Sequence, residues 1–405
     1  MRKKIGLESS LCYNVFSRKH NKTKEIQAMA HCNTIFHQLL QLFPRHEFDR
    51  LAREHHVGQK FRSFNRWSQF GALFMGQLTG RKSLRDIVIN MAAHGKKFYH
   101  LGFSNISRAT LARTNEKQPA SMYEALFNTM LARCQHQAPG NRFRIKNLYL
   151  LDSSTIDLCL EVFPWATFRK TKGAIKLHTG LDADGYLPTF IDMTEGSRHE
   201  INWAKTLQLP KGSTVVFDRG FNDYNWFDEL SSNGIFFVTR LKINADVVPL
   251  KKRRGRKSPG VIEDCEILLG DNLTKFRLVT YNSDDGHRYR FLTNAFHLPA
   301  KTVAELYKER WQIEIFFKWI KQNLKVKTFF GTSRNAVMTQ IWIALCVYLL
   351  LSYIKFKAKI GWAIRKMLNV LQLTLFERRD LLDLFRDKPA RVQPQTTYLP
   401  LLANL

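Results

Sequence analysis

The spacing of hydrophobic residues divides the chain into two parts with different patterns. Up to about residue 140, apolar side chains recur every three or four positions, which is the spacing of one helix face. From Asn147 onward this spacing is replaced by short apolar runs between turn residues, typical of strands: NLYLLD, AIKLHTGL, YLPTFIDMT, TVVFDRG and GIFFVTRL. Three strands in succession, followed by strands that alternate with helices, predict an α/β fold whose sheet has mixed direction.

The first part predicts an all-α domain over residues 31–140, preceded by a loose, basic N-terminus at 1–30. Helices are expected at 34–57 (in two pieces broken near Pro44), 67–78, 83–94, 107–115 and 121–134. Ser83 with Asp86, and Ser121 with Glu124, have the three-residue spacing of a capping box, so each serine is expected to begin a helix.

Residues 242–298 interrupt the alternation of strands and helices, and we interpret them as a β-rich insertion. They contain the basic loop KKRRGRK (251–257) and the runs EDCEILLG, KFRLVTY and RYRFLTN. The loop could contact a DNA minor groove or backbone, or simply remain solvated. The insertion separates a first catalytic part at 141–241 from a last helix at 299–335, and a helical C-terminal region follows at 336–405.

The uncharged run at 341–354 has only fourteen residues, whereas a membrane span needs about twenty. A buried core helix is therefore expected there, and no membrane is expected as a partner. The formal net charge is +29, with an isoelectric point near 10.0, and most of this charge lies in the two flanking thirds of the chain. A strongly basic protein attracts polyanions, above all nucleic acid, so the helical domain at 31–140 is predicted to bind DNA. The cysteines form no CxxC pair and no secretory signal is evident, which favours a cytoplasmic, nucleoid-associated protein.

Three acidic residues are the candidates for chemistry. Asp152 and Asp218 each follow a predicted strand, and ligands of open α/β sheets bind at such carboxyl ends. Glu314 lies in YKERWQIEIFFKWIK, where helical geometry brings Tyr307, Arg310 and Lys321 to the same side as Glu314. Carboxylates for a divalent metal, beside cations for phosphate oxygens, suit phosphodiester chemistry. The alternative is a salt-bridged surface helix.

The pattern Y-x2-R-x3-E-x6-K, together with LLDSSTIDL and VVFDRGF, resembles the bacterial insertion-sequence transposases of the DDE type. The resemblance implies an RNase H-like core in which Asp152, Asp218 and Glu314 bind Mg²⁺, with Mn²⁺ as a substitute. It implies that Tyr307, Arg310 and Lys321 contact phosphates of the transposon end. It also implies double-stranded DNA as partner (terminal inverted repeats and target), a hairpin intermediate, and a homodimer that joins both ends.

Weaker candidates remain open between two roles. Arg219 could touch phosphate or pair with a neighbouring carboxylate. Tyr289 is the candidate for stacking on a flipped base, with Trp311 the alternative, although core packing is the simpler role for Trp311. Arg108 and Arg113 could belong to a DNA recognition helix or to a packing helix with solvated arginines.

His178 and His199 have no metal-ligand spacing and are expected to be structural. Two other functions compete with transposition. One is an RNase H-like nuclease that cuts DNA without joining it, and the other is a DNA-binding regulator without catalysis.

Overall fold

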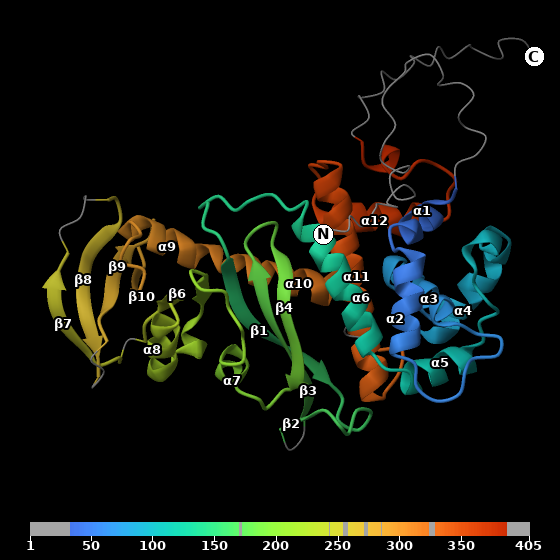
Figure 1. The fold of residues 1–405 in the computed structure, drawn as a ribbon, viewed down its shortest axis with the longest axis horizontal. Coiled ribbons are helices and arrows are strands. Elements are labelled where there is room, and N and C mark those ends of the chain that lie inside the picture. Colours follow the sequence, from blue (N-terminus) through green and yellow to red (C-terminus); the bar gives the residue numbers. More distant parts are fainter. Residues whose placement is uncertain are drawn as a thin grey trace, which may run out of the picture.

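The computed structural model describes residues 33–386, apart from 170–171, 243, 254–257, 271–273, 285 and 324–328. The predicted loose N-terminus at 1–30 and the end of the C-terminal region lie outside this range. A helical part and a ten-stranded sheet lie side by side along the longest axis of the molecule, with the strands β7–β10 at the end away from the helices (Figure 1).

The helical part begins with six helices connected by short segments. They are α1 (Ile35–Gln41), α2 (Arg45–Glu54), α3 (Arg66–Leu78), α4 (Leu84–Ala93), α5 (Arg108–Lys117) and α6 (Ser121–Gln135), with 3₁₀ turns at Gly95–Lys97 and Tyr99–Leu101. Pro44 separates α1 from α2, as the sequence predicts. Every residue of α3 is buried, so α3 is the centre of this part and the other helices pack around it.

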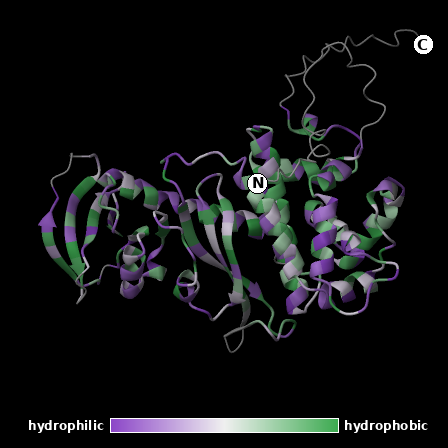
Figure 2. Cartoon of the chain, in the orientation of Figure 1, coloured by the Kyte–Doolittle hydropathy of each residue, from purple (hydrophilic) through white to green (hydrophobic). Residues whose placement is uncertain are grey.

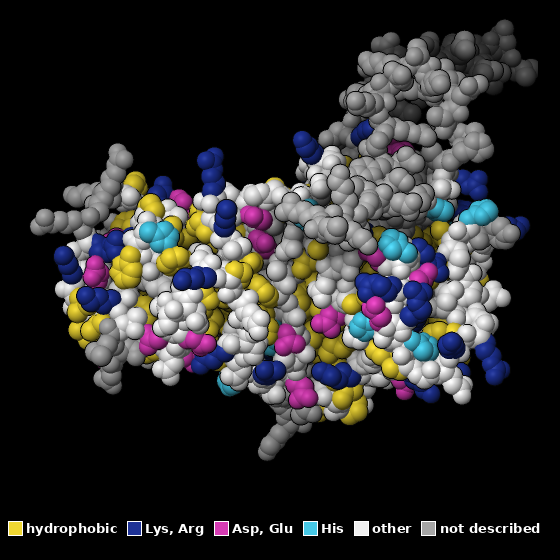
Figure 3. Space-filling view, in the orientation of Figure 1, with side chains coloured by type: hydrophobic (Ala, Val, Ile, Leu, Met, Phe, Trp, Pro, Cys, Tyr) yellow, Lys and Arg dark blue, Asp and Glu magenta, His cyan; other side chains and the backbone are white. Residues whose placement is uncertain are grey.

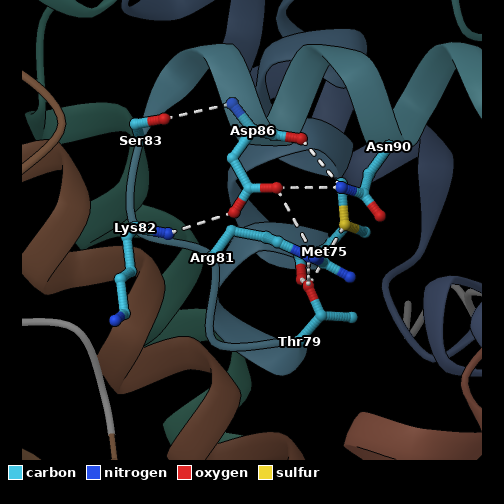
Figure 4. Close-up of polar contacts among 7 residues, drawn as sticks. All are labelled: Met75, Thr79, Arg81, Lys82, Ser83, Asp86 and Asn90. Atoms are coloured by element: carbon cyan, nitrogen blue, oxygen red, sulfur yellow. Dashed lines mark hydrogen bonds and ion pairs between the residues drawn. The ribbon is translucent and has the colours of Figure 1, made fainter.

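The two predicted capping serines behave differently. Ser83 is the N-cap of α4, and its hydroxyl accepts a hydrogen bond from the backbone N–H of Asp86 at 3.1 Å (Figure 4). The Asp86 carboxylate in turn accepts from the N–H of Lys82, so both partners satisfy free backbone donors at the start of the helix. The prediction for Ser121 is wrong: α6 begins at Ser121 itself, Ala120 precedes it without a side-chain cap, and the Ser121 hydroxyl bonds instead to His55.

The C-terminal helices complete the hydrophobic core of the N-terminal ones. Helix α11 (Arg334–Lys357) packs against α3, α5 and α6, and α12 (Ile364–Thr374) packs against α3 and α11. Backbone hydrogen bonds from Ile35 to Glu377 and from Phe36 to Leu375 join the two ends of the described chain. Residues 336–386, including the 3₁₀ turn at Asp383–Phe385, therefore share one core with the helices of residues 33–135.

Among the described residues, α11 is the one helix with the length and apolar composition of a membrane span. Within the protein, however, 94% of its most apolar window is buried. Hydropathy colouring shows hydrophobic and hydrophilic residues mixed along the strands and helices, with hydrophobic stretches on the long helices in the middle of the molecule (Figure 2). The helix at 341–354 is thus covered by other helices of the chain, as a core helix is.

The sheet has the order β2-β3-β1-β5-β6-β10-β9-β8-β7, with β4 also paired to β3. Its first strands are β1 (Leu148–Leu158), β2 (Thr167–Arg169), β3 (Lys172–Asp182), β4 (Leu187–Glu195), β5 (Thr214–Phe217) and β6 (Phe236–Arg240). Strands β1, β3 and β4 are antiparallel neighbours, whereas β5 runs parallel to both β1 and β6. Helix α7 (Glu200–Ala204) precedes β5, and α8 (Tyr224–Ser232) connects β5 to β6. The predicted mixed α/β sheet is confirmed.

The insertion extends the same sheet. Strands β8 (Val261–Leu269), β9 (Phe276–Asn282) and β10 (Arg288–Thr293) correspond to the three predicted runs, and β10 pairs with β6. A fourth strand, β7 (Val247–Lys252), was not predicted. It includes Lys251 and Lys252, so the basic segment does not begin as a loop, and its residues 254–257 lie outside the described range.

The helix that carries Glu314 crosses the sheet in two pieces, α9 (Ala300–Glu309) and α10 (Trp311–Asn323). They continue one another from the insertion towards the helical part (Figure 1). The sequence predicts one continuous helix; Arg310 interrupts it but keeps helical angles, φ −50° and ψ −29°. The side chains of Leu306, Ile313, Phe317 and Ile320 are buried and form the apolar face of these two helices.

Candidate active site

Asp152 and Asp218 lie on neighbouring parallel strands. Strand β1 pairs with β5 from Leu148↔Thr214 to Leu151↔Phe217, and each aspartate is the next residue after this pairing ends. Since neighbouring strands are about 4.8 Å apart, the two backbones lie side by side at this point. Asp152 does not end its strand, however, because β1 continues to Leu158 alongside β3. The strand-end prediction thus holds for Asp218 and is wrong for Asp152.

Arg310 connects the third acid to the first. Its Nη1 lies 3.3 Å from Oδ2 of Asp152, and its Nη2 pairs with Oε1 of Glu314. The side chains of Arg310 and Asp152 are 13% and 16% exposed, while that of Glu314 is 34% exposed. Helix α10 packs on β1 and β3 through its apolar face, which turns Glu314 and Arg310 towards Asp152. The basic residue therefore bridges two of the three acids.

The pKa of Asp152 is raised to about 7, chiefly by burial. The N–H of Ser153 and the Arg310 guanidinium oppose this shift, and the neighbouring carboxylates of Asp218 and Glu200 contribute to it. Burial alone would lower the pKa of Arg310, but its pairing with Glu314 and Asp152 raises it overall, so this side chain stays cationic. Several acidic groups thus lie close together in this site, and a nearby cation stabilises their charged forms.

Because its pKa is raised, Asp152 should lower the free energy of unfolding by an amount that depends on pH. Between its ordinary pKa of about 4 and its folded value of about 7, the native protein holds a proton that the unfolded chain releases. The stability of the protein therefore falls as pH rises through this window. We expect Asp152→Asn to raise the free energy of unfolding relative to the original protein, and by more at pH 8 than at pH 5. Urea unfolding with a chelator present measures this difference; an equal difference at both pH values would contradict it.

Glu200 is a fourth acidic residue of the site, and the sequence analysis missed it. It lies in the first turn of α7, and its carboxylate pairs loosely with Lys176 at 3.7 Å. A Cβ atom added to Gly220 would lie 2.9 Å from Oδ1 of Asp218 and 3.3 Å from Oε2 of Glu200, so these two carboxylates face the same glycine. In the sequence, Glu200 follows a predicted strand and a turn, which could have marked it as a candidate. No spacing rule, however, connects Glu200 with Asp218.

Gly220 also fixes the Asp218 side chain, since its N–H donates to Oδ1 of Asp218 at 2.7 Å. We expect Gly220→Ala to disturb this bond, since the added methyl group would push the Asp218 carboxylate away, and to lower the DNA cleavage implied by the family resemblance by about ten- to a hundredfold. The thermal unfolding midpoint should change little, since Gly220 is exposed. Gly140→Ala, at an exposed position with open space around the added methyl group and no positive φ, is the matched control for loss of a glycine. Equal cleavage by both variants would contradict this role of Gly220.

Three other residues were predicted to contact DNA phosphates near the acids, and of these the structure places the Tyr307 side chain close to Asp218 and Arg310. Burial raises the pKa of Tyr307, the Asp218 carboxylate adds to this rise, and the Arg310 guanidinium lies 5.8 Å from the ring centre. Lys321 is partly exposed, seven residues beyond Glu314 on α10. Arg219 is exposed and makes no ion pair with any described residue, so the expected alternative of a paired Arg219 is not what the structure has.

The aromatic candidates are arranged differently from expectation. Tyr289 is half-buried on β10, stacked on Phe291, and covered by the Arg240 guanidinium 4.9 Å from its ring centre. Trp311 is 58% exposed, so core packing, the simpler role expected for it, is wrong. The reason is the helical spacing of α10: Ile315, which is 48% exposed, follows Trp311 by four residues, so the two side chains lie on the same side, away from the sheet.

The remaining predicted residues are exposed, with the exception of His178. Arg108 and Arg113 are exposed on α5, whose other side buries Leu111 and Thr114. His178 is fully buried between Ser153 and Thr194, with ring nitrogens 2.6 and 2.8 Å from their hydroxyls, and it stacks on Trp203. His199 is exposed next to α7.

Comparison with known proteins identifies the class to which this site belongs. A family model described as "Transposase DDE domain" matches residues 144–350, and one described as "Domain of unknown function (DUF4372)" matches residues 31–104. The first covers about half of the chain and includes all three acids. The chain therefore belongs to the DDE transposase family.

Two relatives agree with this assignment. The Sinorhizobium fredii protein "Putative transposase y4zB" is 32% identical over 288 residues, covering 69% of this chain and 80% of the relative. The Geobacillus stearothermophilus protein "Probable transposase for insertion sequence element IS5377" is 29% identical over 259 residues, covering 62% of this chain and 68% of the relative.

DDE transposase domains generally use divalent metal ions, and the site fits such an ion in chemistry but not in arrangement. Carboxylate oxygens are the ligands that Mg²⁺ prefers. In the described part of the chain, however, no three acidic, His or Cys side chains come together closely enough to hold an ion. Arg310 lies between Asp152 and Glu314 instead, so in this arrangement a guanidinium contacts the oxygens that a metal would need.

Proposed function

We propose that this protein is a DNA transposase that binds the terminal inverted repeats of an insertion sequence, cleaves there, and joins the freed end to target DNA. The proposal rests above all on one combination. The chain belongs to the DDE transposase family, and its sheet brings Asp152 beside Asp218 while Glu314 reaches Asp152 through Arg310. The strand order β4-β3-β1-β5-β6, with three antiparallel strands followed by two parallel ones, supports an RNase H-like core.

The residues of the chain have distinct roles in this proposal. Asp152, Asp218 and Glu314 would hold Mg²⁺, or Mn²⁺ in its place, which would offset charge at the scissile phosphate. Arg310, Tyr307, Lys321 and Arg219 would contact the DNA backbone, where bidentate hydrogen bonds from a guanidinium suit phosphate oxygens. We further propose that the protein acts as a homodimer and that cleavage passes through a hairpin intermediate. Its expected location is the cytoplasm, in association with the nucleoid. Lys and Arg side chains lie on both the helical end and the insertion end of the face in view, available to a long DNA partner (Figure 3).

The exposure of Trp311 makes it a better candidate than Tyr289 for stacking on an unpaired base. A stacking residue must offer a free ring face, and the half-buried Tyr289 already contacts Phe291 and the Arg240 guanidinium through its ring. Trp311 is adjacent to Arg310 and 58% exposed.

The experiment that tests the function is a reaction with the DNA that flanks this gene. The purified protein, a fragment carrying both terminal repeats, a target plasmid and Mg²⁺ are incubated together, and the products are sequenced. Transposition gives target plasmids with the transposon ends joined through their 3′-OH groups. Cut ends without joined products would indicate the nuclease, and bound but uncut DNA would indicate the regulator.

A second measurement decides between the two roles of α5. If Arg108 and Arg113 contact phosphates, the double variant Arg108→Ala/Arg113→Ala should make the slope of log K against log salt shallower by about 1 to 2. Arg85→Ala, an exposed arginine on the neighbouring helix α4, is the matched control. An unchanged slope for the double variant would leave α5 as a packing helix.

A further inference from the structure

Arg310 makes contacts that are unusual for a residue reserved for DNA. Its guanidinium bridges Asp152 and Glu314, so the cation that should await a phosphate already neutralises two of the acids. The Arg310 side chain is only 13% exposed, so its end of both ion pairs is shielded from water. Ion pairs shielded from water are much stronger than exposed ones, so this arrangement has to be displaced before another cation can use the same oxygens.

The bridge leaves one donor of Arg310 unsatisfied. Its Nε is buried and has no hydrogen-bond partner among the described residues. A buried donor without a partner costs about 1–3 kcal/mol. The guanidinium is therefore held by the two carboxylates in a position that does not satisfy it fully, and a ligand with several acceptor oxygens would satisfy it better.

The backbone around Arg310 is fixed. Glu309, which precedes it, is buried; its carboxylate pairs with Arg142 at 2.7 Å and accepts from the Tyr186 hydroxyl. Tyr348 of α11 donates to the carbonyl of Tyr186, which connects this anchor to the helical core. With α9 and α10 held on either side, the Arg310 guanidinium can leave the acids by rotation of its own side chain, without movement of the helix.

We infer that Arg310 is a lock on the acidic site: in the DNA-free protein it takes the place of the divalent ion between Asp152 and Glu314, and a DNA phosphate releases it. This inference rests on the proposed function, because it assumes that these acids hold a metal during catalysis. Phosphate offers the guanidinium two acceptor oxygens in a bidentate arrangement, at a position outside the acids. Binding of DNA and binding of the ion then favour one another, and the chain carries its metal chiefly when DNA is present.

The test is a titration of the full-length protein with Mn²⁺ in the absence of DNA. Electron paramagnetic resonance measures the Mn²⁺ that remains free and so gives the affinity. Arg310→Met removes the charge and the hydrogen-bond donors and keeps an unbranched apolar stem. We expect it to bind Mn²⁺ about tenfold or more tightly than the original protein, a typical size for coupling between two ligands. Arg240→Met removes a neighbouring cation that contacts Tyr289 instead of the acids, and should change Mn²⁺ affinity much less. Equal affinities for the original protein and Arg310→Met would overturn the lock.

A second measurement uses the original protein alone, and so holds even if Arg310→Met folds poorly. A duplex of the terminal repeat should raise its Mn²⁺ affinity by a similar factor, after subtraction of Mn²⁺ bound by the duplex, and Mn²⁺ should raise its DNA affinity equally. No effect of the duplex would contradict the lock. Tight Mn²⁺ binding without DNA that is lost in Asp152→Asn would remove the lock while leaving the proposed metal site intact. Absence of Mn²⁺ binding by every variant, with and without DNA, would remove both.

Discussion

Asp152→Asn and Asp218→Asn are each expected to lower DNA cleavage by roughly a thousandfold or more, the scale seen when one member of a catalytic set is removed. Both substitutions keep the size of the side chain and take away its charge. The two residues directly follow the paired part of β1 and β5, so they face one region, and removal of either charge leaves an incomplete set of ligands. Glu314→Gln should have a similar effect from α10, with the Arg310 contact weakened as well.

Binding of the terminal repeats should survive these substitutions, because most of the affinity for DNA comes from cations that contact phosphates. Electrophoretic mobility shift with end DNA measures binding, and a nicking assay on the same DNA measures cleavage. Asp157→Asn is the matched control, since Asp157 lies on the same strand but is exposed. Full cleavage by the Asp152 variant, or an equal loss in the Asp157 variant, would show that the acids have been assigned wrongly.

The sequence predicts the parts of this site that depend on local patterns. The apolar runs before Asp152 and Asp218 predicted strands that are parallel neighbours and bring the two acids side by side, although β1 continues beyond Asp152. Helical spacing was enough to predict that Leu306 and Ile313 are buried and that Glu314 lies on a different side of the helix. The mixed α/β sheet follows from the same patterns.

The features that the sequence could not predict depend on contacts between distant segments. Nothing in the pattern near Arg310 indicates whether its guanidinium points to solvent or to Asp152, 158 positions earlier. Glu200 reaches Asp218 only because α7 precedes β5 at the same end of the sheet. In the same way, α11 is apolar on all sides because it fills the centre of helices encoded some two hundred residues before it, and its composition alone could not name those helices.

Arg277→Met is expected to cause the largest loss of stability, about 3–5 kcal/mol, the usual cost of breaking a buried ion pair from one side. Arg277 is 2% exposed on β9, and it contacts both oxygens of Asp264 on β8 at 2.8 Å. Its Nη1 also donates to the carbonyls of Ala295 and Leu298, in the segment that leads into α9. The substitution therefore leaves a carboxylate without its main cation, and it removes the donor of one buried and one part-buried carbonyl.

Urea unfolding of the full chain measures this loss as a lower midpoint. Arg253→Met is the matched control, because Arg253 lies 3.8 Å from the same Asp264 but is 27% exposed, and it should cost much less. Adding Asp264→Ala to Arg277→Met should recover part of the stability, since the unpaired carboxylate is removed while the two carbonyls still lack their donor. If Arg277→Met and Arg253→Met had equal midpoints, the insertion would owe its stability to its apolar contacts and not to this pair, and α9 would keep its position on the sheet without it.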